Sequence, residues 1–271
     1  MLPVVQQCSA ASLAFHGNVA NVGKAADRTL DTTEARHASS VLTVLDNTFQ
    51  ELILDAVHRT FPHIRCIAEE NTPMRRAFVG NDSEYVVILD PIDGTLHFQQ
   101  GDAPYHISVG LACKGVMQAA VVTRPSESKI YTAIRSRGSY VQVGGGRPRR
   151  LQLPKRRRTS KAFISTKARA YQKPASARLQ PREYPIGAAL VLTELAEGEL
   201  AAYLTRQVEI YDVGPPSLIA EEAGVRVFLG DGRTPTYDRK RKFNFFMAAA
   251  DNEIRQFLLE LCRRPNLRGK A

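Results

Sequence analysis

The chain has 271 residues, 44% of them hydrophobic and 24% charged, with a formal net charge of +10; this composition is typical of a globular protein and excludes a disordered or fibrous one. The four cysteines form no Cys-x-x-Cys pair, which argues against a zinc ribbon or a disulfide framework. No apolar run approaches the roughly 18 residues of a membrane helix, so we expect a soluble, cytoplasmic protein with no membrane partner.

The first half of the chain predicts one helix followed by strands. Apolar residues recur at three- and four-residue spacing through residues 39–61, which predicts a helix that ends at Pro62. Residues 85–90 form a short apolar run rich in β-branched residues, followed at once by turn residues, which is typical of a buried strand. Three further runs, 106–113, 117–123 and 129–134, predict an antiparallel meander.

Positive charge is concentrated in the middle of the chain. Residues 128–182 contain sixteen Lys or Arg and no acidic residue, whereas the rest of the chain carries 21 basic and 27 acidic residues. The densest part, residues 147–161, follows three glycines and contains two prolines, which indicates a loop. This stretch could bind RNA or another polyanion, or it could be a solvated loop that aids solubility.

The second half alternates helix and strand patterns. Helices are predicted for 187–198, 215–224 and 252–262, and strands for 199–205, 225–230 and 243–250. The mixture indicates an α/β or α+β protein with a division near residues 143–160. We therefore expect an N-terminal α+β part, 1–145, and a C-terminal α/β part, 146–271.

The segment Asp90-Pro91-Ile92-Asp93-Gly94-Thr95 has the clearest chemical meaning in the chain. Two carboxylates three residues apart, on a turn after a buried strand, provide the oxygen ligands that hard cations prefer. Gly94 lets the backbone approach a ligand closely, and Thr95 is a candidate N-cap for a helix whose free N–H groups would receive a phosphate. An Asx-type turn with incidental acids is the alternative for two aspartates at this spacing.

Two further acidic features become informative when they are considered together with this segment. Glu69-Glu70 follows a short apolar run, and Asp212 lies just before the helix predicted at Pro215. Taken alone, paired glutamates are usually solvated, and an aspartate before a helix is usually an N-cap. Together with Asp90 and Asp93 they form the acidic set that a metal site would need.

These motifs, in this order, resemble those of the inositol monophosphatase family, which belongs to the lithium-sensitive, magnesium-dependent phosphatases. The matching segments run from about Leu42 to the C-terminal helix. They are Phe61-Pro62-His63-Ile64, Ala68-Glu69-Glu70, Asp90 to Thr95, Ser108 to Leu111, Gly187-Ala188-Ala189, Tyr211-Asp212-Val213-Gly214 and Glu222-Ala223-Gly224. The resemblance implies a layered α/β/α/β/α sandwich of the sugar-phosphatase type, a homodimer, and Mg²⁺ as cofactor, with about two or three ions per site.

The resemblance also implies a role for each site residue. Glu69, Asp90 and the Ile92 carbonyl would hold a first Mg²⁺, and Asp90, Asp93 and Asp212 a second. Asp46 and Thr95 would orient the attacking water, so that Asp46, Thr95 and Glu69 are the expected catalytic residues. The backbone N–H groups of Gly94 and Thr95 would bind the phosphoryl oxygens.

The sequence departs from the family pattern at five positions. His97 stands where the family has asparagine, Tyr211 where it has tryptophan, Ala188 where it has serine or threonine, and Thr205 where inositol-type enzymes often have a glutamate for a sugar hydroxyl. Lys24 precedes Asp46 by more residues than the corresponding family lysine does, so we expect the N-terminal lysine element to align poorly.

The leading hypothesis is a Mg²⁺-dependent phosphomonoesterase that hydrolyses a small phosphorylated metabolite. The alternatives within this class are a 3′(2′),5′-bisphosphate nucleotidase, a fructose-1,6-bisphosphatase-like enzyme and a histidinol-phosphate phosphatase. A hypothesis from another class is a binding protein that engages RNA or a transcription complex through residues 147–161.

Overall fold

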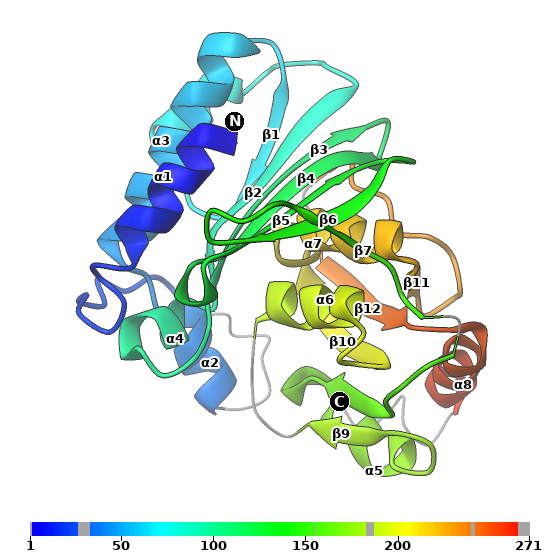
Figure 1. Cartoon of the computed structure of the whole chain (residues 1–271). Coiled ribbons are helices and arrows are strands. Elements are labelled where there is room, and N and C mark those ends of the chain that lie inside the picture. Colours follow the sequence, from blue (N-terminus) through cyan, green and yellow to red (C-terminus); the bar gives the residue numbers. More distant parts are fainter. Residues whose placement is uncertain (1, 27–32, 155, 183–186, 240–241, 265–271) are drawn as a thin grey trace.

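In the computed structural model of the chain, the described residues are 2–26, 33–154, 156–182, 187–239 and 242–264. They form two β-sheets and three layers of helices that alternate as α/β/α/β/α (Figure 1). The layered architecture expected from the sequence is therefore confirmed. No helix among these residues is long and apolar enough to cross a membrane.

The first sheet has seven strands in chain order, so its neighbours in space are its neighbours in sequence. Its strands are β1 (Arg65–Ala68), β2 (Tyr85–Asp93), β3 (His106–Cys113), β4 (Val116–Arg124), β5 (Lys129–Ile134), β6 (Gly138–Val143) and β7 (Arg149–Leu151). The pair β1–β2 is parallel, and every later pair is antiparallel. The predicted meander is confirmed, but it continues through β6 and β7 into the basic stretch, where we had expected only a loop.

Two helices cover the outer face of this sheet, α1 (Leu2–Ser12) and α3 (Val44–Thr60). Phe49, Ile53 and Val57 of α3 share a buried cluster with Val87 and Leu89 of β2. This stripe recurs at helical spacing, as the sequence pattern predicted. A short α2 (Thr33–Ser40) precedes α3.

The prediction of one continuous helix over residues 39–61 was wrong at its start. Helix α3 begins at Val44, with Thr43 as its N-cap in extended conformation. The Asp46 carboxylate accepts hydrogen bonds from both the backbone N–H and the hydroxyl of Thr43, at 2.8 and 2.6 Å. This local capping interaction fixes the start of the helix at Val44, because the Asp46 side chain satisfies the Thr43 N–H, which therefore needs no partner in a preceding helical turn.

The central layer consists of α6 (Ala188–Glu197) and α7 (Ile210–Ala223), which lie between the two sheets (Figure 1). Helix α7 is buried on nearly all sides. A Cβ added at Gly110 of β3 would lie 3.2 Å from the Pro215 side chain and 2.3 Å from the Met117 Cε atom. Glycine at this position therefore lets α7 approach the sheet closely.

Helix α7 starts earlier than the sequence predicted. We expected its start at Pro215, because proline is favoured in the first turn of a helix. The helix instead begins at Ile210, which places Pro215 and Pro216 inside it and Asp212 in its first turn. The prolines remove the helical hydrogen bonds that would go to the carbonyls four residues earlier, and burial of the surrounding apolar residues offsets that loss.

The second sheet and its outer helices complete the fold. Its strands are β8 (Lys161–Ile164), β9 (Gln180–Arg182), β10 (Ala202–Glu209), β11 (Arg226–Leu229) and β12 (Lys242–Ala249), in the spatial order β11-β12-β10-β8-β9. Helix α8 (Asn252–Arg263) and the short α5 (Gln172–Ala175) pack on the outer side. The remaining elements are the six-residue α4 (Thr95–Gln100) and three 3₁₀ turns, η1 (Met74–Phe78), η2 (Pro125–Glu127) and η3 (Thr166–Tyr171).

Candidate functional site

A β-bulge at the end of β2 brings two aspartates to one face of the sheet. Asp90 pairs with Ser108 of β3, whereas Asp93 pairs with His106. Between these two pairs β2 advances by three residues and β3 by only two, so β2 contains one extra residue. Without the extra residue, side chains three positions apart would point to opposite faces of the sheet. The bulge therefore turns both carboxylates toward the central helices. The sequence predicted a turn here, but the strand continues through Asp93.

Two other carboxylates reach Asp90 from separate elements. The parallel pairing of β1 with β2 ends at Ala68 and Leu89, so Glu69 follows directly beside Asp90. Asp212 comes from the first turn of α7. Burial raises the pKa of Asp90 well above its ordinary value, and the charges of Glu69, Asp93 and Asp212 raise it further. The structure thus gathers the four acids that the sequence had singled out.

Asp93 is held by the beginning of α6. Its Oδ2 accepts a hydrogen bond from the Ala189 backbone N–H at 2.8 Å. A Cβ added at Gly187, the N-cap of α6, would lie 2.4 Å from the same oxygen atom, so a larger residue there would force the Asp93 carboxylate or α6 to move. Burial nevertheless raises the pKa of Asp93 to about 7, because the backbone donors only partly offset the loss of water.

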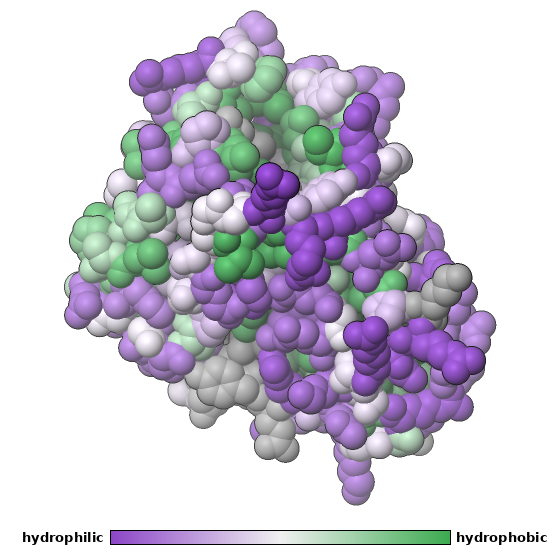
Figure 2. Space-filling model, in the orientation of Figure 1, coloured by the Kyte–Doolittle hydropathy of each residue, from purple (hydrophilic) through white to green (hydrophobic). Residues whose placement is uncertain are grey.

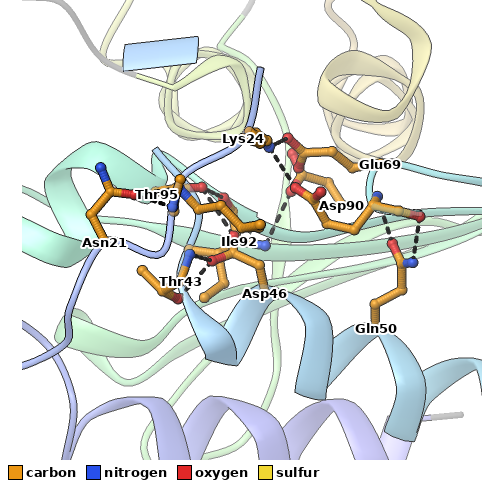
Figure 3. Close-up of polar contacts among 12 residues, drawn as sticks. Asn21, Lys24, Thr43, Asp46, Gln50, Glu69, Asp90, Ile92 and Thr95 are labelled. Carbon is orange, nitrogen blue, oxygen red and sulfur yellow. Dashed lines mark hydrogen bonds and ion pairs between the residues drawn. The ribbon is translucent and has the colours of Figure 1, made fainter. Parts of the chain in front are cut away.

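Asp46 and Thr95 face each other on the other side of the acidic group (Figure 3). The Thr95 hydroxyl lies 3.1 Å from Asp46 Oδ1 and 2.9 Å from the Ile92 carbonyl oxygen. Asp46 is fully buried, and burial raises its pKa to about 7, with a smaller contribution from the negative charge of Glu69. The structure therefore brings together the two residues expected to orient a water molecule.

Lys24 reaches the acidic group from the N-terminal segment, contrary to our expectation. Its ammonium group lies 2.6 Å from Glu69 Oε1 and 2.5 Å from Glu70 Oε1 (Figure 3). Burial opposes its charged form, but the two glutamates raise its pKa above the ordinary value. The residue spacing between Lys24 and Asp46 was misleading, because the backbone N–H of Lys24 bonds to the Ser40 carbonyl and so brings the two segments together.

Glu70 and Gln50 form a connection that the sequence analysis missed. The Gln50 amide accepts from the Glu70 backbone N–H at 2.9 Å and donates to the Glu70 carbonyl at 2.7 Å. Burial raises the pKa of Glu70, and the charge of Glu69 acts in the same direction. The two hydrogen bonds between Gln50 and Glu70 connect the end of β1, where Glu69 lies, to α3, which carries Asp46. One glutamine in an apolar helix stripe is too weak a signal to reveal it.

The backbone after Asp93 turns sharply at Gly94, which has a left-handed φ of +87°. Gly94 is the N-cap of α4 and Thr95 its first residue, so the prediction of Thr95 as N-cap was wrong by one position. Because glycine has no Cβ, it adopts this φ without steric strain. The N–H groups at the start of α4 have no helical partner four residues earlier and point away from the helix, which suits them to bind an anion.

The donor set fits a divalent cation. As they stand, no three acidic, histidine or cysteine side chains in the described part of the chain are close enough to form a ready-made metal site. The carboxylates are nevertheless hard oxygen donors, and burial raises the pKa of Asp212 well above its ordinary value, with the charges of Asp93 and Glu69 adding to it. Buried acids that raise one another's pKa in this way favour a cation that neutralises them.

The side of the site next to Asp212 has a different chemistry. Ser165 Oγ and Thr205 Oγ1 share a buried hydrogen bond of 2.8 Å, and the Lys167 ammonium donates to the Gln207 carbonyl at 3.2 Å. The charge of Lys167 lowers the pKa of Asp212, although burial dominates that pKa. This side is therefore polar and carries a positive charge.

Comparison with known proteins adds to this geometry. A model of the inositol monophosphatase family matches residues 5–262. The Nus factor SuhB of Pasteurella multocida is 26% identical over 223 residues, covering 77% of this chain and 78% of that protein. The inositol-1-monophosphatase of Mycobacterium bovis is 28% identical over 202 residues, covering 71% and 69%.

Solved structures show the same fold. The Thermotoga maritima inositol monophosphatase TM1415 has a TM-score of 0.77 at 18% identity, covering 99% of this chain and 96% of that one. SuhB from Bartonella henselae has a TM-score of 0.77 at 20% identity, covering 98% and 97%.

Proposed function

Because the chain belongs to the inositol monophosphatase family, whose members are metal-dependent phosphatases, we propose that it is a Mg²⁺-dependent phosphomonoesterase acting on a small phosphorylated metabolite. The observation that carries this proposal is the convergence of Glu69, Asp90, Asp93 and Asp212, from the end of β1, from β2 and from α7, beside the Asp46–Thr95 pair. An acidic cluster alone would suit cation storage. The adjoining hydroxyl and carboxylate supply the proton-transfer groups that hydrolysis needs.

We assign the cation ligands as the family resemblance implies. Glu69, Asp90 and the Ile92 carbonyl form one set, and Asp90, Asp93 and Asp212 form the other, so that Asp90 belongs to both. Bound Mg²⁺ supplies charge neutralisation of the buried acids and polarisation of the phosphoryl group. Lys24 contributes a further positive charge at the Glu69 end of the site.

The remaining chemistry belongs to the side chains and backbone of the protein. A water molecule next to Thr95 would give its proton to the threonine hydroxyl while that hydroxyl donates to Asp46 Oδ1. A carboxylate whose pKa is about 7 is well matched to accept a proton near neutral pH. The N–H groups of Gly94 and Thr95 would hold the phosphoryl oxygens as charge develops on them.

The surroundings of the leaving group determine which phosphate ester is the substrate. The leaving group would lie on the side opposite the Asp46–Thr95 pair, next to Asp212, because phosphoryl transfer is in line. That side presents Ser165, Thr205 and Lys167. Inositol 1-phosphate is the reference substrate, and the homodimer implied by the resemblance stays a prediction that size-exclusion chromatography would test.

Phosphate release from a panel of esters tests the proposal. The panel contains inositol 1-phosphate, adenosine 3′,5′-bisphosphate, fructose 1,6-bisphosphate and histidinol phosphate, each with Mg²⁺ and with a chelator. We expect one ester to be hydrolysed in a Mg²⁺-dependent manner, Li⁺ to inhibit, and Asp90→Asn to abolish turnover. Asp82→Asn, an aspartate outside the acidic group, is the matched control. Hydrolysis that persists in chelator, or survives in Asp90→Asn, would contradict the assignment.

A further inference from the structure

A second group of charged side chains lies behind the candidate site and has no part in the proposed chemistry. Its centre is Arg124, the last residue of β4, which is only 3% exposed. The Arg124 Nε donates to His106 Nε2 of β3 at 3.2 Å, and its Nη2 donates to Thr193 Oγ1 of α6 at 2.8 Å. One guanidinium group therefore bridges a strand of the first sheet and a helix of the central layer.

The charges in this group balance. Arg124 Nη1 lies 3.0 Å from Glu127 Oε2, and Lys129 lies 2.9 Å from the same oxygen and 3.1 Å from Glu197 Oε1. Two cations thus face two carboxylates. Lys129 shares these acids with Arg124 but has no recorded hydrogen bond to His106 or Thr193 among the described residues. Charge neutrality and the bridge between elements are therefore separable functions.

Both arms of the bridge end at Asp93. His106 is the residue that pairs with Asp93 immediately after the bulge. On the other arm, the Thr193 hydroxyl lies 2.8 Å from the Ala189 carbonyl, and the N–H of the same Ala189 donates to Asp93 Oδ2. The Arg124 guanidinium thus connects the strand beside Asp93 to the helix turn that orients its carboxylate.

Burial of an arginine costs solvation energy, and hydrogen bonds to two different elements fix its geometry. A planar guanidinium can hold both partners at once, whereas the ammonium group of a lysine cannot reproduce the two directions. Without that bridge, α6 could shift relative to β3, and the Ala189 amide would move away from Asp93. Residues that orient ligands in this way commonly change metal affinity when they are replaced.

We propose that Arg124 is a positioning residue for Asp93, acting through His106 on one side and through Thr193 and Ala189 on the other. This inference rests on the proposed role of Asp93 as a cation ligand. It predicts that the bridge, rather than the total charge of the cluster, determines how well the site binds Mg²⁺.

The test is Mg²⁺ binding to the metal-free protein by titration calorimetry, without substrate. Thr193→Val removes one hydroxyl and keeps every charge, and Arg124→Gln removes the guanidinium. We expect both variants to bind Mg²⁺ on the order of 10 to 100 times more weakly than the wild type, the range typical of residues that orient ligands. Arg124→Lys should behave like Arg124→Gln, because it keeps the charge and loses the bridge.

Lys129→Gln is the matched control, because it removes a charge from the same cluster and leaves the bridge intact; its Mg²⁺ affinity should stay close to that of the wild type. A folded Thr193→Val variant with unchanged affinity overturns the proposal, even if Arg124→Gln fails to fold. Equal losses in Lys129→Gln and Arg124→Gln overturn it as well. A wild-type protein that binds no divalent cation contradicts the proposed function itself, so the two failures are distinguishable.

Discussion

The surroundings of Asp46 determine the pKa of its carboxyl group. Its carboxylate accepts two hydrogen bonds from Thr43, which caps α3, and faces the Thr95 hydroxyl with its other oxygen. These donors favour the charged form, but complete burial outweighs them and raises the pKa to about 7. The carboxylate that takes part in capping the helix is thereby also suited to accept a proton.

The first prediction concerns turnover. Asp46→Asn keeps the shape of the side chain but cannot accept a proton, so kcat should fall by about 10²- to 10⁴-fold. Mg²⁺ binding should persist, because Asp46 is not among the proposed ligands. Asp55→Asn, on the exposed side of the same helix, is the control and should keep full activity. A kcat within a few-fold of wild type for Asp46→Asn would remove this residue from the mechanism.

The second prediction concerns stability and pH in a chelator. The pKa of Asp46 is about 7 in the folded protein and 3.8 in its ordinary state, so between these values only the folded chain binds the proton. The wild type should therefore lose stability relative to Asp46→Asn as pH rises through this interval, by about 1.4 kcal/mol per pH unit. Above it, the difference should be constant. Urea unfolding at a series of pH values measures this, and a wild type that gains stability relative to Asp46→Asn as pH rises would contradict the sign.

At the scale of elements, the site depends on where strands and helices end. The bulge in β2 turns Asp90 and Asp93 to one face, and the start of α6 meets Asp93 there. Gly187 permits this contact, since a Cβ at this position would overlap the Asp93 carboxylate unless the carboxylate or α6 moved. The glycine has an ordinary negative φ of −65°, so close approach, rather than backbone conformation, demands it.

The third prediction tests this contact. Gly187→Ala places a methyl group 2.4 Å from Asp93 Oδ2, so either α6 or the carboxylate has to move. We expect a substantial loss of kcat and of Mg²⁺ affinity with a smaller change in the unfolding free energy. Gly145→Ala, where the added Cβ meets no atom within 4 Å, is the control and should behave like the wild type. Wild-type kinetics for Gly187→Ala would show that Asp93 tolerates displacement.

At the scale of the whole molecule, charge is distributed away from the site. The site is acidic, whereas exposed arginines lie on β7 and on the connections before and after it: Arg147, Arg149, Arg150, Arg156 and Arg158. Figure 2 shows strongly hydrophilic residues on this face, beside β7 and near α8. Arg157 differs from its neighbours, because it is half-buried and lies 3.4 Å from Asp251 at the start of α8.

The fourth prediction separates this surface from catalysis. Replacing Arg149, Arg150, Arg156 and Arg158 by glutamine should leave turnover of a small monophosphate nearly unchanged, because the proposed phosphate ligands are backbone N–H groups and cations. Any binding to RNA or heparin should weaken, with a shallower dependence on salt. Replacing the same number of exposed acidic residues elsewhere controls for folding. A loss of turnover in the folded arginine variant would mean that this surface reaches the substrate.

The sequence alone was sufficient where the signal is local. The continuous apolar run and β-branching of residues 85–90 predicted β2, the spacing of Phe49, Ile53 and Val57 predicted the apolar face of α3, and the motif beginning at Asp90 identified Asp90 and Asp93. The layered fold followed from the resemblance and is confirmed by the structure. Each of these features is encoded within a few neighbouring residues, so no distant contact is needed to recognise it.

Only the tertiary structure decided how these pieces meet. A bulge in the pairing of β2 with β3 placed Asp93 on the same face as Asp90, which spacing alone would have set apart. Backbone pairing of the N-terminal segment brought Lys24 to Glu69, 45 residues away in sequence. The Arg124 bridge depends on β3, β4 and α6 together. Hydrogen bonds between residues far apart in the chain leave no periodic trace in the sequence, because either partner alone resembles an ordinary polar residue.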